Sequence, residues 1–179
     1  IPLDGICTLG EKLGIDALDD IRILVLLWKM GCSEKPGQMN HNEWMQGCSR
    51  LQVDSWKQMK DLLPTLETGF LEQVEFKEFY KFCFSFNLQG THRTLDKDLV
   101  VGLLRMVFKE SRISEVRLDT FCEFLEKNES YQRITLDQWT SFLDFCLEYP
   151  EQSMAGFDES TSAWPVLIDE YVEFIEEKK

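Results

Sequence analysis

Apolar side chains recur at three- and four-residue intervals along most of this 179-residue chain, and no segment sustains the apolar–polar alternation of a strand. The first pattern lines one face of a helix, whereas the second is typical of a half-buried strand. The sequence therefore predicts an all-α fold with, at most, very short strand pairs. The predicted helices are residues 5–13, 17–30, 42–50, 55–63, 76–87, 95–108, 117–126, 136–148 and 164–177.

Residues 88–94 are typical of a linker, because they contain Gly90 and no apolar residue after Leu88. They divide the chain into residues 1–88 and 89–179, which we expect to be two helical halves packed into one globular domain. The longest apolar run, residues 23–28, is too short to span a bilayer. Because the chain begins with Ile1 and not with Met, we expect it to be a fragment.

The last predicted helix carries two stripes of opposite character. One stripe is apolar and is expected to pack inward: Trp164, Leu167, Ile168, Tyr171 and Ile175. The other is acidic: Asp169, Glu173 and Glu176. Ser162 is the expected N-cap, and Pro165 falls in the first turn, where its missing N–H costs little. On most helices such an acidic stripe is simply a solvated face.

Negative charge is concentrated in the same region. Residues 134–177 contain 11 acidic residues and no Lys or Arg, so they carry −11 of the chain's net charge of −13. An acidic field of this strength repels nucleic acid and anionic lipid, and it attracts basic partners. We therefore expect the C-terminal third to dock on a basic protein surface through contacts that weaken as salt rises.

Four segments have an aliphatic residue or Met followed, five positions later, by an aromatic residue: 39–44, 74–79, 116–121 and 134–139. This pattern is typical of the end of an EF-hand loop, whose eighth residue is apolar and pairs with a neighbouring loop, and whose twelfth is usually Glu. Two segments keep that acid, as Glu43 and Glu78. The sequence thus predicts two EF-hand-like pairs, one on each side of the 88–94 linker.

Calcium binding is not expected at these loops. A calcium loop needs oxygen ligands at its first, third and fifth positions and Gly at its sixth. The first positions here are Cys32, Glu67, Lys109 and Lys127, and only one loop has Gly, Gly37, at its sixth position. None of the loops therefore supplies enough carboxylates in the required places.

The cysteines and histidines also lack the spacing of a metal site or of a catalytic site. The six cysteines contain no CxxC pair, so we expect them to be reduced and mostly buried in an intracellular protein. His41 and His92 belong to no ligand cluster and are expected at the surface. No P-loop, nucleophile elbow, dinucleotide fingerprint or zinc-protease motif is present. We therefore expect no metal, no cofactor and no enzymatic activity.

Residues 134–145, ITLDQWTSFLDF, and 157–174, FDESTSAWPVLIDEYVEF, resemble the potentiating-neddylation domain of the defective-in-cullin-neddylation proteins. The first half agrees through residues 4–6, DGI, residues 28–29, WK, and residues 76–87, FKEFYKFCFSFN. The resemblance covers essentially the whole chain. It implies two calcium-free EF-hand-like halves that act as a non-catalytic co-ligase in cullin-RING ligase complexes. Such a scaffold holds a cullin and the neddylation conjugating enzyme together, which raises their effective concentration.

The resemblance places the cullin-binding surface in the second half, on Asp137, Ala163 and Asp169. The partner is the C-terminal winged-helix region of a cullin. The two carboxylates would face a basic surface, and Ala163 would allow close approach. Without the resemblance, Asp137 in a helix N-cap region and Asp169 as a solvated acid would be the favoured interpretations.

The resemblance also places an apolar pocket in the first half for the N-terminally acetylated Met of the conjugating enzyme's tail helix. An acetyl amide needs only hydrogen bonds, whereas a free α-ammonium group is costly to bury. The aligned pocket positions are Ile6, Ile23, Leu26, Leu27, Met30, Phe86 and Met106. Most of these residues would also be core in any helical bundle. The chain departs from its relatives near residues 36–39, at the polar rim of this pocket.

Other functional readings remain open at this point. The main alternative is an EF-hand-derived peptide-binding module of another pathway, which a cullin pull-down would distinguish. A calcium sensor is disfavoured by the loops, and an enzyme ranks last. The pathway implies a location in the nucleus and cytoplasm, and we expect no contact with nucleic acid or with a membrane.

Overall fold

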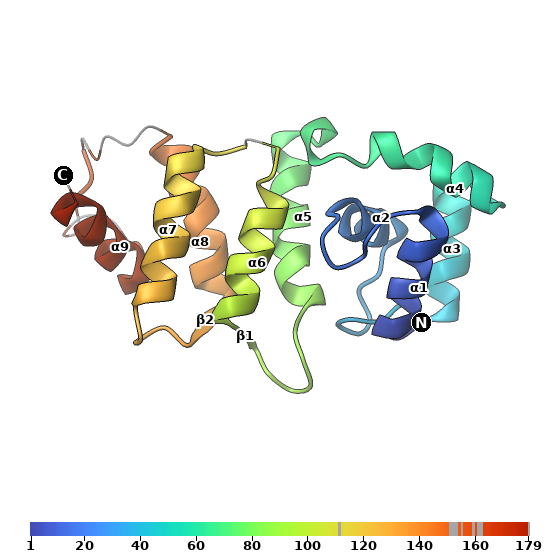
Figure 1. Ribbon diagram of the computed structural model, residues 1–179, viewed down its shortest axis with the longest axis horizontal. Helices are drawn as coiled ribbons and strands as arrows, with labels where there is room; N and C mark the ends of the chain where they lie inside the picture. The colour runs from blue at the N-terminus through green and yellow to red at the C-terminus, as the bar shows by residue number, and fades with distance from the viewer. Residues whose placement is uncertain (111, 151–153, 155, 159, 161–162, 179) are drawn as a thin grey trace. The chain divides into compact units, whose positions relative to one another are not determined.

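The computed structural model describes residues 1–110, 112–150, 154, 156–158, 160 and 163–178, and these residues are predominantly helical (Figure 1). The chain divides into two compact units, Ile1–Thr91 and His92–Lys179, and the division falls inside the predicted linker. The first unit contains α1 (Leu3–Leu13), α2 (Arg22–Met30), α3 (His41–Leu51), α4 (Trp56–Leu62), two 3₁₀ turns (Leu63–Thr65 and Thr68–Phe70) and α5 (Gln73–Phe86). The second contains β1 (Thr94–Asp96), α6 (Lys97–Val107), α7 (Glu115–Lys127), β2 (Arg133–Thr135), α8 (Leu136–Glu148) and α9 (Val166–Glu177).

Helix α2 is shorter than predicted, because it begins at Arg22 and not at residue 17. The carboxylate of Asp16 accepts a hydrogen bond from the backbone N–H of Leu18, so it closes a turn. Leu18 is exposed and does not belong to the core. The carboxylate of Asp20 accepts hydrogen bonds from both the backbone N–H and the guanidinium of Arg22. These side-chain bonds compete with helical hydrogen bonds and delay the start of the helix.

Helix α8 has the predicted bounds, whereas α9 begins at Val166, two residues later than predicted. The residue that precedes α9 is Pro165, which makes no side-chain capping bond. The expected N-cap, Ser162, lies outside the described residues.

The core of the first unit is centred on α2, whose sequence is largely apolar. Its residues Ile23 to Leu27 are all buried. Helix α3 approaches α2 closely at Gly47, where an added Cβ would lie 2.6 Å from the Cβ of Met30. In the second unit, Phe121 stacks on Phe142 with ring centroids 3.8 Å apart, and aromatic rings of α7, α8 and α9 continue this core.

The cysteines agree with the sequence prediction in most respects. All six are free, and Cys32, Cys83, Cys122 and Cys146 are buried. Cys7 and Cys48 are only partly buried. Burial raises the pKa of Cys83 well above that of an ordinary thiol, so this side chain stays protonated and behaves as a small apolar group.

Two of the four apolar positions in the predicted repeat form backbone pairings, but neither pairs with the apolar residue of its neighbouring loop. Ile134 in β2 lies opposite Leu95 in the antiparallel partner β1. Met39 exchanges two backbone hydrogen bonds with Ile1, one of them 3.0 Å long. Each is followed by a capping box, Asn40 with Glu43 at α3 and Thr135 with Gln138 at α8. The two units therefore share one local arrangement, although the partners are not the predicted ones.

The other two positions were predicted wrongly, because they lie inside helices. Val74 is in the first turn of α5 and Val116 is in the first turn of α7, and both side chains are exposed. Helix α5 starts early because Glu72 and Glu75, one on each side of Val74, form a capping box. Capping satisfies backbone donors that would otherwise favour a strand pairing at this position.

Glu43 occupies the place of the acid that would ligate calcium, but its oxygens serve the loop before α3. One carboxylate oxygen accepts from the backbone N–H groups of Ser33 and Glu34, at 2.8 and 3.0 Å, and the other accepts from that of Asn40 at 2.8 Å. Burial by itself raises the pKa of Glu43, but these hydrogen bonds outweigh it and hold the pKa below its ordinary value. Glu43 thus replaces a metal ion as the centre that orders the loop.

We expect Glu43→Gln to lower the free energy of unfolding by about 2 kcal/mol at neutral pH, because an amide cannot accept all three backbone bonds. Since the pKa is lowered on folding, the wild-type stabilisation is present above the unfolded pKa and is lost as pH falls through the folded pKa. The two stabilities should therefore converge in acid, which denaturant unfolding at neutral and acid pH would measure. The control is Glu78→Gln at an exposed position of α5, which should leave stability unchanged. Equal losses in both variants would contradict this role.

Candidate functional site

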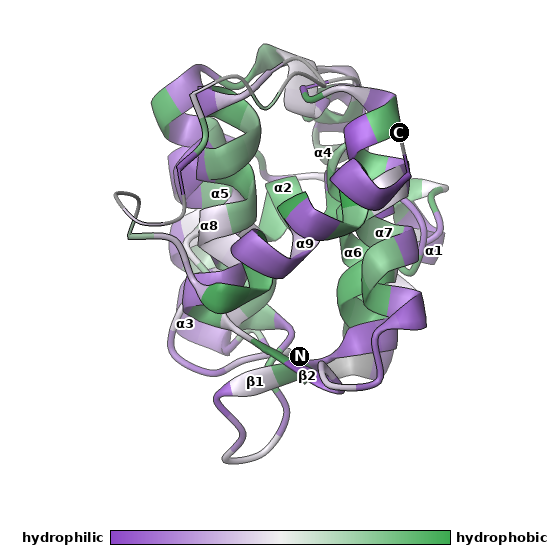
Figure 2. Cartoon of the chain, turned by 90° about the vertical axis from the view of Figure 1, so that its left-hand side faces the viewer, coloured by the Kyte–Doolittle hydropathy of each residue, from purple (hydrophilic) through white to green (hydrophobic). Residues whose placement is uncertain are grey.

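Helix α9 separates buried apolar residues from carboxylates, as predicted, and Figure 2 shows hydrophilic and hydrophobic residues alternating along it. The buried residues are Leu167, Ile168, Tyr171 and Val172, so Val172 belongs to the packed face and Ile175 is only half-buried. The hydroxyl of Tyr171 donates to the backbone carbonyl of Arg117 at 3.1 Å and so fixes α9 against α7. The exposed residues include Glu173 and Glu176.

Asp169 and Glu170 are the half-buried acids of α9, and Asp169 differs from the other acids of this helix in having a buried oxygen without a partner. Its Oδ1 atom is buried and accepts no hydrogen bond from any residue that the structure describes. Burial, and next the negative charge of Glu173, raise the pKa of Asp169 above its ordinary value. A buried carboxylate oxygen without a donor is costly to the free domain. A cationic donor from a partner could satisfy it.

Tyr131, in the turn between α7 and β2, borders the same acids and was not among the predicted site residues. Burial, a hydrogen bond with Glu170 and the charges of Glu170 and Asp169 raise the pKa of Tyr131 to about 12. Its hydroxyl therefore remains a donor at neutral pH. No sequence motif marks this tyrosine, because its proximity to α9 arises from packing between Phe124 and the rings of Tyr131 and Phe174.

The other two predicted cullin-binding residues lie near helix starts. Asp137 is exposed in the first turn of α8, where the helix dipole favours a carboxylate, while the capping hydroxyl belongs to Thr135. Ala163 is exposed just ahead of α9. Helices α8 and α9 pack against each other, so Asp137 and Asp169 occupy the first turns of two contacting helices.

Arg117, a buried arginine of α7, contacts α8 and the segment that follows it. Arg117 in α7 is buried, and its guanidinium carbon lies 5.0 Å from the centre of the Phe145 ring. One guanidinium nitrogen donates to the sulfur of Met154 at 3.8 Å. Arg117 therefore contacts Met154, which belongs to the segment between α8 and α9 that also contains Ala163.

Six of the seven predicted tail-pocket residues lie in the first unit, where they are between 0 and 6% exposed. They come from three helices: Ile6 from α1, Ile23, Leu26, Leu27 and Met30 from α2, and Phe86 from α5. The seventh, Met106, is half-buried in α6 of the second unit. In this structure the six residues of the first unit are core, which is how residues of this type behave in any helical bundle.

Phe86 is the predicted pocket residue that also lines a described cavity. That cavity has a volume of about 200 Å³ and includes Cys32, Pro36 and Phe82 among its lining residues. It lies where the loop after α2 meets the end of α5, close to the residues 36–39 at which the sequence departs from its relatives.

The described ranges are residues 1–110, 112–150, 154, 156–158, 160 and 163–178. These ranges hold no group of three or more His, Cys, Asp and Glu side chains arranged to bind a metal ion. No helix within them combines the length and the apolar character that crossing a membrane requires.

The fold and these acidic helix ends define a predominantly helical, two-unit domain with a strongly acidic second unit. A family model described as "Cullin binding" matches residues 58–174, which is well over half of the chain. The chain therefore belongs to this cullin-binding family, as the sequence resemblance implied.

Curated relatives agree with this membership. DCN1-like protein 4 of Homo sapiens is 29% identical over 169 residues, which cover 94% of this chain and 55% of that protein. DCN1-like protein 5 of Homo sapiens is 29% identical over 92% of this chain and 66% of its own length. DCN1-like protein 3 of Xenopus laevis is 30% identical over 89% of this chain and 52% of its own length. The chain thus spans roughly half to two thirds of these relatives.

Proposed function

We propose that this domain promotes the neddylation of cullins as a non-catalytic scaffold. It holds the C-terminal winged-helix region of a cullin and, separately, the acetylated N-terminal tail of the neddylation conjugating enzyme. The observation that carries this proposal is the cullin-binding family match across residues 58–174, which includes α8 and most of α9. Holding two reactants on one scaffold accelerates transfer between them by raising their effective concentration.

The cullin surface of this proposal consists of Asp137, Ala163 and Asp169. Support comes from the two carboxylates in first turns of contacting helices and from the buried Oδ1 of Asp169, which lacks a donor among the described residues. A lysine or arginine of the cullin would pair with Asp169. Exposed Ala163 leaves room for close approach.

The tail pocket of this proposal belongs mainly to residues 1–88, and the cullin surface to residues 89–179. The cavity at Phe86, with Pro36 and Phe82, supports an apolar entry for the acetylated Met. Met30 would adapt its flexible side chain to the incoming group. The two halves are EF-hand-like and calcium-free in this proposal, which the paired residues before α3 and α8 and the loop bonds of Glu43 support. The compartment that follows from the pathway is the nucleus and cytoplasm.

The test is titration of the domain with a cullin winged-helix fragment at low and at physiological ionic strength. We expect binding at both, with an affinity that falls several-fold as salt rises, because the proposed contacts are between exposed or half-exposed charges. The same preparation should accelerate cullin neddylation by a limiting amount of conjugating enzyme.

Absence of binding at either salt would overturn the cullin assignment and leave a peptide-binding module of another pathway. Binding that does not respond to salt would overturn the electrostatic part alone. Binding without acceleration of neddylation would contradict the scaffold role.

A further inference from the structure

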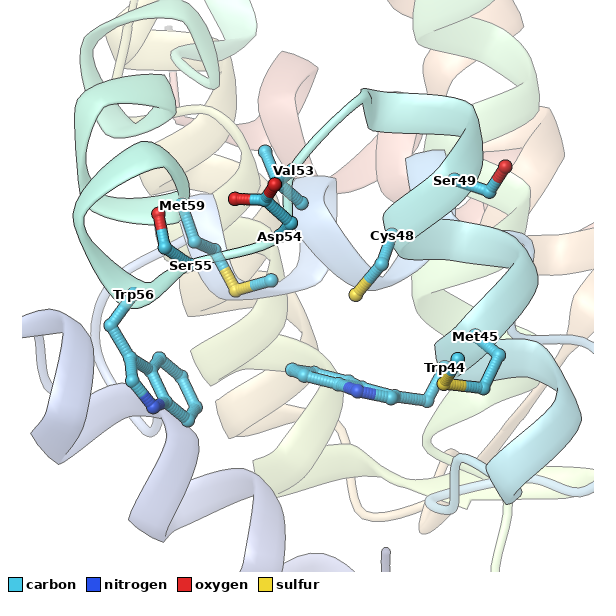
Figure 3. A pocket seen from close by; sticks show the side chains of 9 residues that line it. All are labelled: Trp44, Met45, Cys48, Ser49, Val53, Asp54, Ser55, Trp56 and Met59. Carbon is cyan, nitrogen blue, oxygen red and sulfur yellow. The ribbon is translucent and has the colours of Figure 1, made fainter.

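Helices α3 and α4 border a second cavity of the first unit, with a volume of about 490 Å³. The rings of Trp44 and Trp56 form two of its walls, with centroids 6.2 Å apart and planes inclined at 46°. Figure 3 shows the two rings on either side of the opening, with the sulfur atoms of Cys48 and Met59 directed into the space between the helices. The volume lies within the range of roughly 300–1,000 Å³ that is usual for ligand pockets.

The mouth of this cavity exposes large apolar side chains. Met45 is 55% exposed and Trp56 is 44% exposed, and Trp44 is half-buried beside them. Clustered exposure of this kind is unfavourable in water and is typical of an interaction site. Tryptophan and methionine are also among the residues enriched at protein interfaces.

The charge at the cavity favours a cation. Asp54 is the one charged residue that lines the cavity, and its carboxylate makes no hydrogen bond or ion pair with any residue in the described ranges. The ammonium group of Lys12 lies 5.1 Å from the centre of the Trp56 ring in a cation–π contact, so the Trp56 ring is already paired with a cation and Asp54 is the group left to pair with a ligand cation. Residues 1–91, the unit that holds the cavity, contain 13 acidic and 9 basic residues, and this net charge of −4 further disfavours an anionic ligand.

Helix α8 of the second unit carries a tryptophan at the position that corresponds to Trp44 of α3, but its surroundings differ. Trp139 follows Ile134 as Trp44 follows Met39, but Trp139 is fully buried. The second unit packs the Trp164 ring edge-on against Phe145 of α8, with centroids 5.8 Å apart. Its own aromatic side chains thus cover α8, whereas α3 keeps an open cavity beside its tryptophan.

We propose that the α3–α4 cavity binds a short partner segment in which an apolar side chain is followed by arginine or lysine. The apolar side chain enters the cavity alongside the Trp44 and Trp56 rings and contacts Met59. The cationic group stays at the mouth and pairs with Asp54. This cavity shares no lining residue with the proposed cullin surface or tail pocket. A test of ligand binding here is therefore independent of the tests of those two sites.

The experiment is an NMR titration with acetyl-Leu-Arg-amide, followed through the indole N–H signals of the five tryptophans. We expect the Trp44 and Trp56 signals to shift and saturate, while those of Trp28 and Trp139 stay unchanged. Acetyl-Leu-Glu-amide and acetyl-Ala-Arg-amide are matched probes, each of which removes one half of the recognition. Both should bind at least fivefold more weakly.

Asp54→Asn tests the charge without disturbing the fold, because the side chain is exposed. It should bring the affinities for the Arg and Glu dipeptides within twofold of each other. Trp56→Ala should abolish the saturable shift, whereas Lys60→Ala on the same helix, outside the cavity lining, should preserve it. No shift at Trp44 and Trp56, shifts confined to Trp28, or equal affinity of the wild type for the Arg and Glu dipeptides would each overturn the proposal.

Discussion

Asp169→Lys is expected to weaken binding of the cullin winged-helix region by more than tenfold, or about 1.4 kcal/mol. The substitution puts a positive charge where the proposed partner presents one, and it removes the half-buried carboxylate whose Oδ1 lacks a donor among the described residues. Isothermal titration calorimetry at constant ionic strength would measure the change. Glu176→Lys makes the same charge change at an exposed position of α9 and should cost less than threefold. Similar losses in both variants would show that α9 acts only through its overall charge.

Asp169→Asn separates a binding role from a structural one. Because the pKa of Asp169 is raised on folding, the folded state favours the neutral carboxyl, so ionisation above the folded pKa costs stability. The neutral amide should therefore unfold at an equal or higher temperature than the wild type at neutral pH, while its cullin affinity still falls. Stability of the wild type should rise relative to this variant as pH falls through the folded pKa, and cullin affinity should fall over the same interval. A clearly lower melting temperature for Asp169→Asn would contradict this account.

The second large effect is expected at the tail pocket. A conjugating-enzyme tail peptide with an acetylated N-terminal Met should bind at least tenfold more tightly than the same peptide with a free amine at neutral pH. The free α-amine has an ordinary pKa of about 7.7–8.0, so it is mostly charged and must be desolvated on entry. Fluorescence anisotropy with C-terminally labelled peptides would measure both affinities.

The pH dependence provides an internal control for the tail experiment. Above the pKa of the amine, the unmodified peptide becomes neutral, and the difference between the two peptides should shrink. The acetylated peptide should bind with little change over the same range. Equal affinity of the two peptides at neutral pH would count against the pocket.

The spacing of apolar residues along the chain was enough to predict the positions of most helices. The three- and four-residue periodicity predicted α8 with its observed bounds and α3 and α4 to within one residue at each end. The apolar and acidic stripes of α9 were also predicted, because a helix has a fixed period and each side chain's direction follows from its place in the sequence. The concentration of charge in residues 134–177 needs no structure at all.

Tertiary packing decided what local signals could not. The sequence pattern made Glu43 and Glu78 equivalent, but only Glu43 meets three backbone N–H groups, because the loop after α2 folds back over it. It also predicted Val116 as a pairing residue, whereas the residue opposite Ile134 is Leu95. Strand partners come from distant parts of the chain, so their choice depends on how the helices pack.

The same distinction applies to the candidate sites. The sequence selected Asp137 and Asp169 by resemblance, but only the structure distinguishes an exposed acid from a half-buried one with an unsatisfied oxygen. The cavity between Trp44 and Trp56 has no sequence signature, because it depends on the space left between α3 and α4. Helix period and net charge are thus properties of the sequence alone, whereas burial, hydrogen-bond partners and cavities arise only when distant segments come together.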